Sequence, residues 1–266
     1  MTAIFLAPHY DDVALSCGGT VAALAEATRR DPSADPAVAS SPAPLVVTVF
    51  GGTPGGESLT AFARWQHERW GTDGHDTVAV RGDEERAAAS ILGCATRTFP
   101  YLDAIYRGDQ YLSDEALFGP ILPGDASLVA QLTVAIAALP NLSTLYVPLA
   151  IGNHVDHQIV YQVGQILAAR GLRVLGYEDF PYAILGDERE RRLAAIRAAL
   201  GEPELVPIAA TLPRRIAAIA AYRTQLPTIF RFTDDWPGAV MAWAGEIGGD
   251  HGAAERFWPL LGQNGS

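Results

Sequence analysis

Residues 3–12 read Ala3-Ile-Phe-Leu-Ala-Pro-His-Tyr-Asp-Asp12, a short apolar run that ends in a histidine and two aspartates. Such a run, bounded by a proline, is typical of a buried strand, and apolar residues then recur at helical spacing up to Thr28. A strand, a loop and a helix in this order begin a βαβ unit. The polar cluster is therefore predicted to lie where the first strand turns into the first helix.

Apolar runs and helical periods keep alternating along the chain. Further strands are predicted at residues 45–50, 96–101, 144–149, 173–177 and 204–209, and helices at 83–92, 127–139, 156–170, 188–200 and 214–225. This alternation favours right-handed crossovers and a mainly parallel sheet with helices on both faces. We therefore predict a Rossmann-like three-layer α/β/α fold, with residues 1–266 as a single domain and the Pro-, Ala- and Ser-rich stretch 31–44 as a solvated connection.

Charge and composition exclude several classes of function. The net charge of −11 argues against binding to nucleic acid or to an anionic membrane surface, both of which are negatively charged. All 19 basic residues are arginines, which excludes Schiff-base chemistry and a phosphate-binding Gly-Lys-Ser loop. The two cysteines, Cys17 and Cys94, are too few for a disulfide framework.

The same composition bears on location and assembly. The apolar run at the start of the sequence lacks a basic flank and is too short for a secretory signal, so we expect a cytoplasmic protein. The most apolar long stretch, residues 128–151, is interrupted by polar residues and prolines, and no membrane span is expected. A homo-oligomer is possible.

A second polar cluster, His154-Val155-Asp156-His157, follows the strand predicted at residues 144–149. Ligands of open parallel sheets bind beyond the carboxyl ends of the strands, which is where both clusters fall. His154 and His157 share one face of a first helical turn. Imidazoles and carboxylates around one open position are what a catalytic zinc site requires, so the two clusters together predict a metal site.

Each cluster also has a plainer explanation when it is taken alone. An Asp-Asp pair that opens a helix is an ordinary N-cap and dipole partner. Asp156 either caps its helix or orients a neighbouring histidine. The metal interpretation gains weight because both histidine–carboxylate clusters occupy the same edge of one predicted sheet.

The two clusters resemble the motifs of the PIG-L and LmbE-like de-N-acetylases, zinc enzymes that remove acetyl groups from N-acetylglucosaminyl conjugates. Their first motif, Ala-His-Pro-Asp-Asp-Glu, is similar to residues 8–13, and their second, His-Pro-Asp-His, is similar to residues 154–157. Tyr10, Val13 and Val155 depart from these patterns, but none of them replaces a ligand or the base.

The resemblance implies a role for each side chain of the two clusters. His9, Asp12 and His157 would bind zinc, Asp11 would act as general base, and His154 would face the developing oxyanion. A weaker match, Arg81-Gly82-Asp83-Glu84, is similar to the family's Arg-x-x-Glu, and Asp103 stands where the family often places an acidic sugar contact.

Arg81 and Asp103 also suit a polyhydroxylated ring by their chemistry, although each could equally form a surface ion pair. Trp65 and Trp70 are candidates for aromatic faces on which a sugar stacks. Further candidates for the wall of the site, with core or surface roles as the alternative, are Glu178, Asp179, Tyr182, Tyr222 and Gln225.

The sequence therefore predicts a zinc-dependent hydrolase that removes the N-acetyl group from a small-molecule amino-sugar conjugate of the N-acetylglucosamine type. Two alternatives stay open. One is a zinc amidase that cleaves a larger acyl or thiol conjugate from the same site. The other is a nucleotide-sugar transferase or binding module that holds a divalent cation through phosphates.

Overall fold

In the computed structural model, which describes residues 2–29, 42–55, 59–72 and 76–262, seven strands form one mixed sheet. Most of the predicted connection at residues 31–44 lies outside these ranges. The strands are β1 (Thr2–Ala7), β2 (Leu45–Thr48), β3 (Ala95–Thr98), β4 (Leu142–Pro148), β5 (Arg173–Tyr177), β6 (Glu204–Pro207) and β7 (Ala254–Pro259).

The strand order is β3-β2-β1-β4-β5-β7-β6, and all pairs from β3 to β5 are parallel. This confirms the predicted mainly parallel sheet. The sequence did not predict β7, which runs antiparallel between β5 and β6. The strand order reverses at the neighbours β1 and β4, so a crevice opens beyond their carboxyl ends, the usual ligand position in such sheets.

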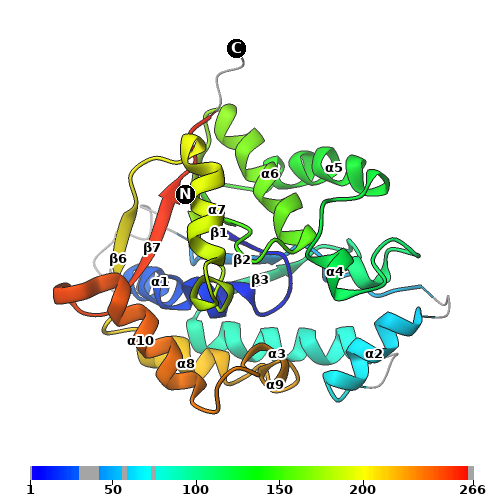
Figure 1. Cartoon of the computed structure of the whole chain (residues 1–266). Coiled ribbons are helices and arrows are strands. Elements are labelled where there is room, and N and C mark those ends of the chain that lie inside the picture. Colours follow the sequence, from blue (N-terminus) through cyan, green and yellow to red (C-terminus); the bar gives the residue numbers. More distant parts are fainter. Residues whose placement is uncertain (1, 30–41, 56–58, 73–75, 263–266) are drawn as a thin grey trace.

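Helices cover both faces of the sheet, as predicted. Figure 1 shows α5 and α6 on one face and α1, α3 and α8 on the other. Within the described ranges, no helix is both long and apolar enough to cross a membrane. The helices are α1 (Asp12–Arg29), α2 (Ala61–Arg69), α3 (Thr77–Leu92), α4 (Asp114–Leu117), α5 (Ala126–Ala137), α6 (Val155–Ala169), α7 (Glu188–Ile196), α8 (Leu212–Ile219), α9 (Leu226–Ile229) and α10 (Trp236–Gly248).

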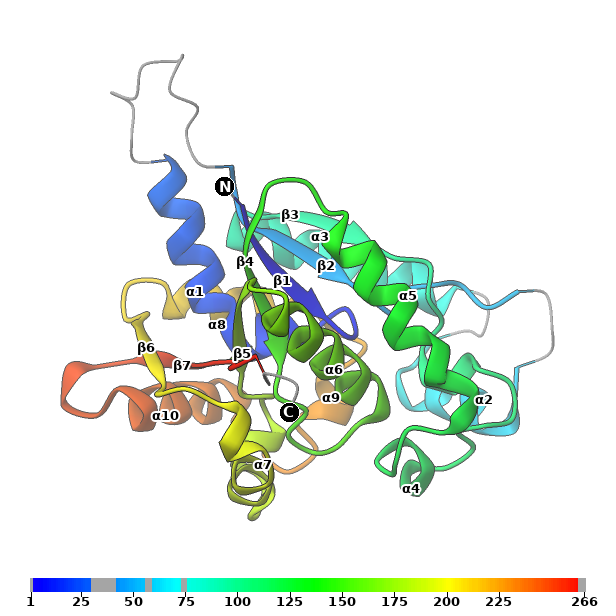
Figure 2. The ribbon, with the colours of Figure 1, turned by 90° about the horizontal axis from the view of Figure 1, so that it is seen from above.

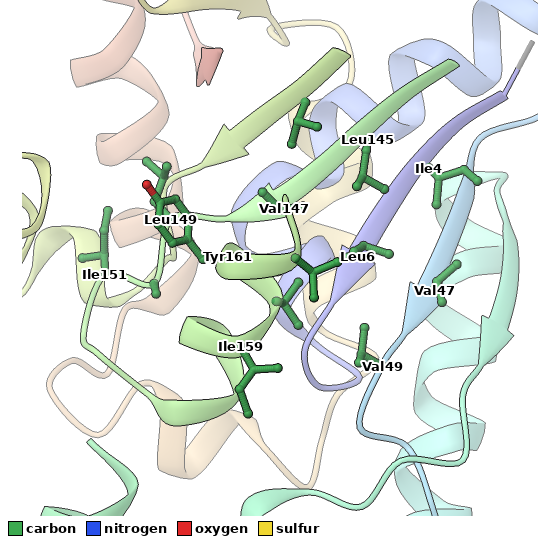
Figure 3. Packing of buried hydrophobic residues seen from close by; sticks show 14 of the residues in the cluster. Ile4, Leu6, Val47, Val49, Leu145, Val147, Leu149, Ile151, Ile159 and Tyr161 are labelled. Carbon is green, nitrogen blue, oxygen red and sulfur yellow. The ribbon is translucent and has the colours of Figure 1, made fainter. Parts of the chain in front are cut away.

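The alternation of side chains along β1 divides the core into two layers. Ile4 and Leu6 pack in the same cluster as Ile159 of α6 (Figure 3). Phe5 points to the other face and its ring stacks on that of Tyr146, with centroids 4.1 Å apart. The strand is therefore buried on both faces, which explains why it reads as a continuous apolar run.

Helix α1 is broken at Cys17, whose φ and ψ of −146° and 24° are not helical. The carboxylate of Glu255, in β7, accepts hydrogen bonds from the backbone N–H groups of Gly19 and Thr20 at 2.9 and 2.8 Å. These bonds cap the second half of the helix. Arg215 of α8, fully buried, lies 3.2 Å from the same carboxylate. The last strand thus fixes the path of the first helix.

Candidate active site

The loop after β1 delivers the first group of polar side chains. His9 donates its backbone N–H to Oδ2 of Asp12 at 2.7 Å, and its Nδ1 atom lies 3.6 Å from the same oxygen. Asp11, which is 5% exposed, and Asp12 both line a pocket of about 220 Å³ at the carboxyl ends of the strands. The turn from strand to helix therefore brings the three predicted side chains to one cavity.

The loop between β4 and α6 brings the second group to the same place. Its residues Ala150, Gly152 and Asn153 have positive φ angles, a sharp turn that places the start of α6 beside β1. Nε2 of His157 lies 3.5 Å from Oδ1 of Asp12, and one nitrogen of His157 lies within 4.8 Å of one nitrogen of His9. The two motifs, over 140 residues apart in sequence, converge on one point.

Buried carboxylates hold the other nitrogens of these two histidines. Nε2 of His9 lies 3.0 Å from Oδ2 of Asp156, and Nδ1 of His157 lies 2.6 Å from Oδ1 of Asp179. Asp156 therefore orients a histidine, one of the two roles predicted for it. These contacts leave Nδ1 of His9 and Nε2 of His157 turned toward Asp12.

His154 occupies a different position from the other two histidines. It caps the start of α6, where its Nδ1 atom accepts a hydrogen bond from the backbone N–H of Asp156 at 3.2 Å. A neutral imidazole whose Nδ1 accepts carries its proton on Nε2. Burial, together with the neighbouring His9, lowers the pKa of His154 well below its usual value. His154 is thus a neutral ring that presents an Nε2–H donor.

Arg81 and Asp103 are buried rather than placed on the surface. They are 7% and 6% exposed, they line the same pocket, and Nη1 of Arg81 lies 3.8 Å from Oδ2 of Asp103. Nη2 of Arg81 lies 3.9 Å from Oδ2 of Asp11. The guanidinium is attracted to both carboxylates without a short hydrogen bond to either, so it stays available to a polar ligand.

Charges within the cluster shift its proton affinities. Burial opposes the cationic form of His9, but the carboxylates of Asp103, Asp156 and Asp12 outweigh it and raise its pKa to about 9. Burial also raises the pKa of Asp11, against the opposing effect of Arg81. The negative field that favours a proton on His9 favours a divalent cation in the same way.

Two distances within the predicted ligand set, those from Asp12 to each histidine, suit a metal ion. Ligands about 2.1 Å from a tetrahedral ion lie about 3.4 Å from one another. Oxygens of Asp12 lie 3.6 and 3.5 Å from the inward nitrogens of His9 and His157, close to that spacing. In addition, a carboxylate behind each ligating histidine is the usual arrangement of protein metal sites.

Two other groupings of potential ligands occur nearby, and each has a donor already engaged. Nitrogens of His9, His154 and His157 lie within 4.8 Å of one another, but His154 uses Nδ1 to accept a backbone hydrogen bond. His9, Asp103 and Asp156 form the second grouping, in which an oxygen of Asp156 lies 2.6 Å from the guanidinium of Arg107. His9 belongs to both groupings and His157 to one, whereas Asp12 belongs to neither.

The other wall candidates from the sequence differ in where the structure places them. Trp70, Tyr182 and Gln225 line the pocket. Trp65 does not appear in its lining, and its side chain is 43% exposed. The sequence missed Arg107, Leu117 and Phe118, because nothing in their spacing links them to either motif. Two further candidates have structural partners instead: Tyr222 donates to Glu85, and Glu178 accepts from Arg256 and Trp258.

Fold and site together define a three-layer α/β protein with a histidine–carboxylate cluster that suits a divalent metal. No protein-family model matches the chain. A 2'-N-acetylparomamine deacetylase of Niallia circulans is 29% identical over 96% of this chain and 89% of its own length. A solved A40926 pseudoaglycone deacetylase is 25% identical, with a TM-score of 0.72 over 99% of this chain and 98% of that one.

The zinc-inhibited form of a teicoplanin deacetylase superposes over the full length of both chains with a TM-score of 0.80 at 22% identity. These relatives and neighbours are deacetylases, in keeping with the resemblance of the chain to the PIG-L and LmbE-like de-N-acetylases. Together they indicate an enzyme that hydrolyses N-acetyl amide bonds of sugars.

Proposed function

We propose that this chain is a zinc-dependent de-N-acetylase that releases acetate and a free amine from an N-acetylglucosamine-type conjugate. The observation that carries the proposal is the position of Asp12 between the inward nitrogens of His9 and His157. The names of two similar proteins, a 2'-N-acetylparomamine deacetylase and an A40926 pseudoaglycone deacetylase, support this substrate class.

In this proposal His9, Asp12 and His157 hold the ion. A zinc ion held there would supply Lewis acidity, which polarises an amide carbonyl and eases deprotonation of a water. Two imidazoles and one carboxylate leave a position open to substrate, as catalytic zinc sites do. This ligand set favours zinc over magnesium, which prefers oxygen donors, and argues against the phosphate-binding alternative.

Asp11 is the proposed general base. Its carboxylate is adjacent to Asp12 and lines the pocket, and its raised pKa makes it a better proton acceptor than an exposed aspartate. As a water oxygen adds to the amide carbon, Asp11 takes the water proton. When the C–N bond breaks, the same carboxyl returns a proton to the leaving amine, so one residue serves both steps.

His154 is the proposed oxyanion donor. Its Nε2–H is the free side of a neutral ring, and this hydrogen bond strengthens as negative charge grows on the former carbonyl oxygen. The loss of one such donor costs on the order of 100- to 1000-fold in rate. Arg81 and Asp103, on the α3 side of the pocket, are proposed to hold the sugar hydroxyls.

An acetate-release assay with methyl and aryl N-acetyl-β-D-glucosaminides tests the function. The purified protein is expected to carry about one zinc per chain and to lose activity on chelation. Asp11→Asn should keep the zinc and lose activity, whereas His157→Ala should lose the zinc. Full metal content in His157→Ala would contradict the ligand set, and release of a larger acid in preference to acetate would favour the amidase alternative.

The domain organisation, the association of copies and the cellular location stay predictions. Residues 1–266 are proposed to act as one catalytic domain, and gel filtration would show whether copies associate. A cytoplasmic location is proposed from the free cysteines Cys17 and Cys94, because thiols persist in reducing compartments. Cell fractionation would test it.

A further inference from the structure

The outer part of the pocket is lined largely by apolar side chains from three separate segments. Phe232 is 40% exposed, and its ring packs on that of Phe230 with centroids 5.9 Å apart. Water that faces such a wall is displaced favourably by an apolar ligand. This apolar wall consists of Leu117 and Phe118, Tyr182 and Leu185, and Ile229 and Phe232. Figure 2 shows α4 and α9, which carry or precede four of these residues, in separate parts of the molecule.

The apolar wall begins at the reaction centre and ends at the open mouth. The ring of Phe118 contacts His154 and Tyr182 edge to face, with centroids 5.4 and 5.9 Å apart. Arg231 and Phe232 also line the pocket, and both are exposed to solvent. A group that lies along the wall can therefore continue out of the protein, as an aglycone does and an acetyl group does not.

The charged groups of the outer pocket have a positive balance. Arg69 and Arg231 face a single carboxylate, Asp114, which accepts a hydrogen bond from Gln66 at 3.3 Å. The deeper carboxylates Asp11, Asp12 and Asp103 are adjacent to Arg81 and to the histidines of the centre. An ammonium group on the aglycone would find few unpaired acceptors along this wall.

We propose that the pocket selects amino-sugar conjugates whose aglycone is apolar and carries no positive charge. An aryl or alkyl group at the anomeric carbon would lie against Tyr182, Ile229 and Phe232. The selection rests on the proposed de-N-acetylase function and goes beyond it, because it names what the sugar is attached to.

Rates on matched substrates test the selection. The value of kcat/KM is expected to be on the order of 10- to 100-fold higher for p-nitrophenyl than for methyl N-acetyl-β-D-glucosaminide, the range over which an apolar pocket discriminates. An N-acetylated aminoglycoside with a cationic aglycone should be poorer than the aryl glycoside. Phe232→Ala should lower the aryl-to-methyl ratio several-fold. Met241→Ala, at a side chain 49% exposed on α10 and outside the pocket lining, should leave the ratio unchanged.

A binding measurement separates the pocket from the reaction. Phenyl and methyl β-D-glucoside carry no acetyl group, and titration calorimetry of the zinc-loaded protein should show tighter binding of the phenyl glucoside. Phe232→Ala should weaken binding of the phenyl glucoside and Met241→Ala should not. If no glucosaminide releases acetate while this difference persists, the proposed reaction fails and the apolar selection stands.

Three results would overturn the selection. Equal kcat/KM for the aryl and methyl glycosides would show that the apolar wall does not contact the aglycone. A preference for the cationic conjugate would show that the charge balance has no effect. Faster hydrolysis of an N-hexanoyl than of an N-acetyl glucosaminide would assign the wall to the acyl chain instead.

Discussion

The Nδ1 atom of His157 lies 2.6 Å from Oδ1 of Asp179, and the other carboxylate oxygen of Asp179 accepts the backbone N–H of Ile151 at 2.9 Å. Asp179 is 2% exposed and directly follows β5 and Glu178. One carboxylate thus ties a proposed metal ligand to the loop that carries it. The orientation of His157 is set by the neighbouring strand rather than by its own helix alone.

Asp179→Asn is expected to weaken zinc binding about 10- to 100-fold, because a neutral amide supports the ring less strongly than a carboxylate. Competition with a chromophoric chelator measures the affinity. Glu178→Gln is the matched control, since the Glu178 carboxylate accepts from Arg256 and Trp258 instead. Equal zinc affinity of Asp179→Asn and the parent would show that Asp179 only fills space.

Arg107→Met is expected to destabilise the fold by about 3–5 kcal/mol, because it removes the buried cation that lies between two buried carboxylates. The Arg107 guanidinium lies 2.6 Å from Asp156 and 3.0 Å from Asp125, and its side chain is 8% exposed. Urea denaturation followed by circular dichroism measures the change.

Arg173→Ala removes an ion pair of similar length with Glu204, but both partners are exposed, at 57% and 40%. It should cost less than about 1 kcal/mol. Similar losses for the two variants would mean that Arg107 does not compensate buried charge.

Glu85 is expected to make the fold less stable as pH rises. Burial raises its pKa from the usual value of 4.5 to about 8, although Tyr222 donates to the carboxylate at 2.6 Å. Between these pH values the folded chain keeps a proton that the unfolded chain has lost, so the free energy of unfolding falls.

Glu85→Gln should remove this pH dependence, so that its melting temperature exceeds that of the parent at pH 9 by more than at pH 5. Glu246→Gln, at a side chain 66% exposed, should change neither value. A constant difference between Glu85→Gln and the parent across this range would contradict the assignment.

Gly152→Ala is expected to reduce activity on the order of 10-fold or more through the position of His154. The residue has a φ of +87°, and a Cβ atom there would lie 2.5 Å from the ring of Tyr182. Gly71→Ala is the control, because its φ is +62° but nothing lies within 4 Å of the added atom. Both variants should lose about 1–2 kcal/mol of stability from the left-handed backbone. Retained kcat/KM in Gly152→Ala would show that this loop tolerates the shift.

The sequence located the site residues that directly follow the ends of strands. Apolar runs located β1 and β4, and the polar residues after them gave His9, Asp12 and His157. Arg81 was less well described, because the structure begins α3 at Thr77 whereas the periodicity indicated a start near residue 83. Gly82 and its charged neighbours interrupt the apolar periodicity near the start of α3, so the sequence pattern began the helix too late.

The carboxylates that support the histidines could not be paired from sequence. Asp156 and His9 are 147 residues apart, and Asp179 and His157 are 22 apart, so only the sheet order brings them together. Trp65 and Trp70 were equivalent candidates for sugar stacking in the sequence, but Trp65 lies within α2 and Trp70 caps its C-terminus. Their different exposure depends on which face of α2 meets the pocket, and that face is set by tertiary packing.

The contact between Glu255 and the break in α1 spans 236 residues. A ribosome therefore releases the first helix long before the residue that caps its second half has been made. During synthesis the backbone N–H groups of Gly19 and Thr20 lack their cap. The native helix forms completely only after β7, which carries Glu255, has been made.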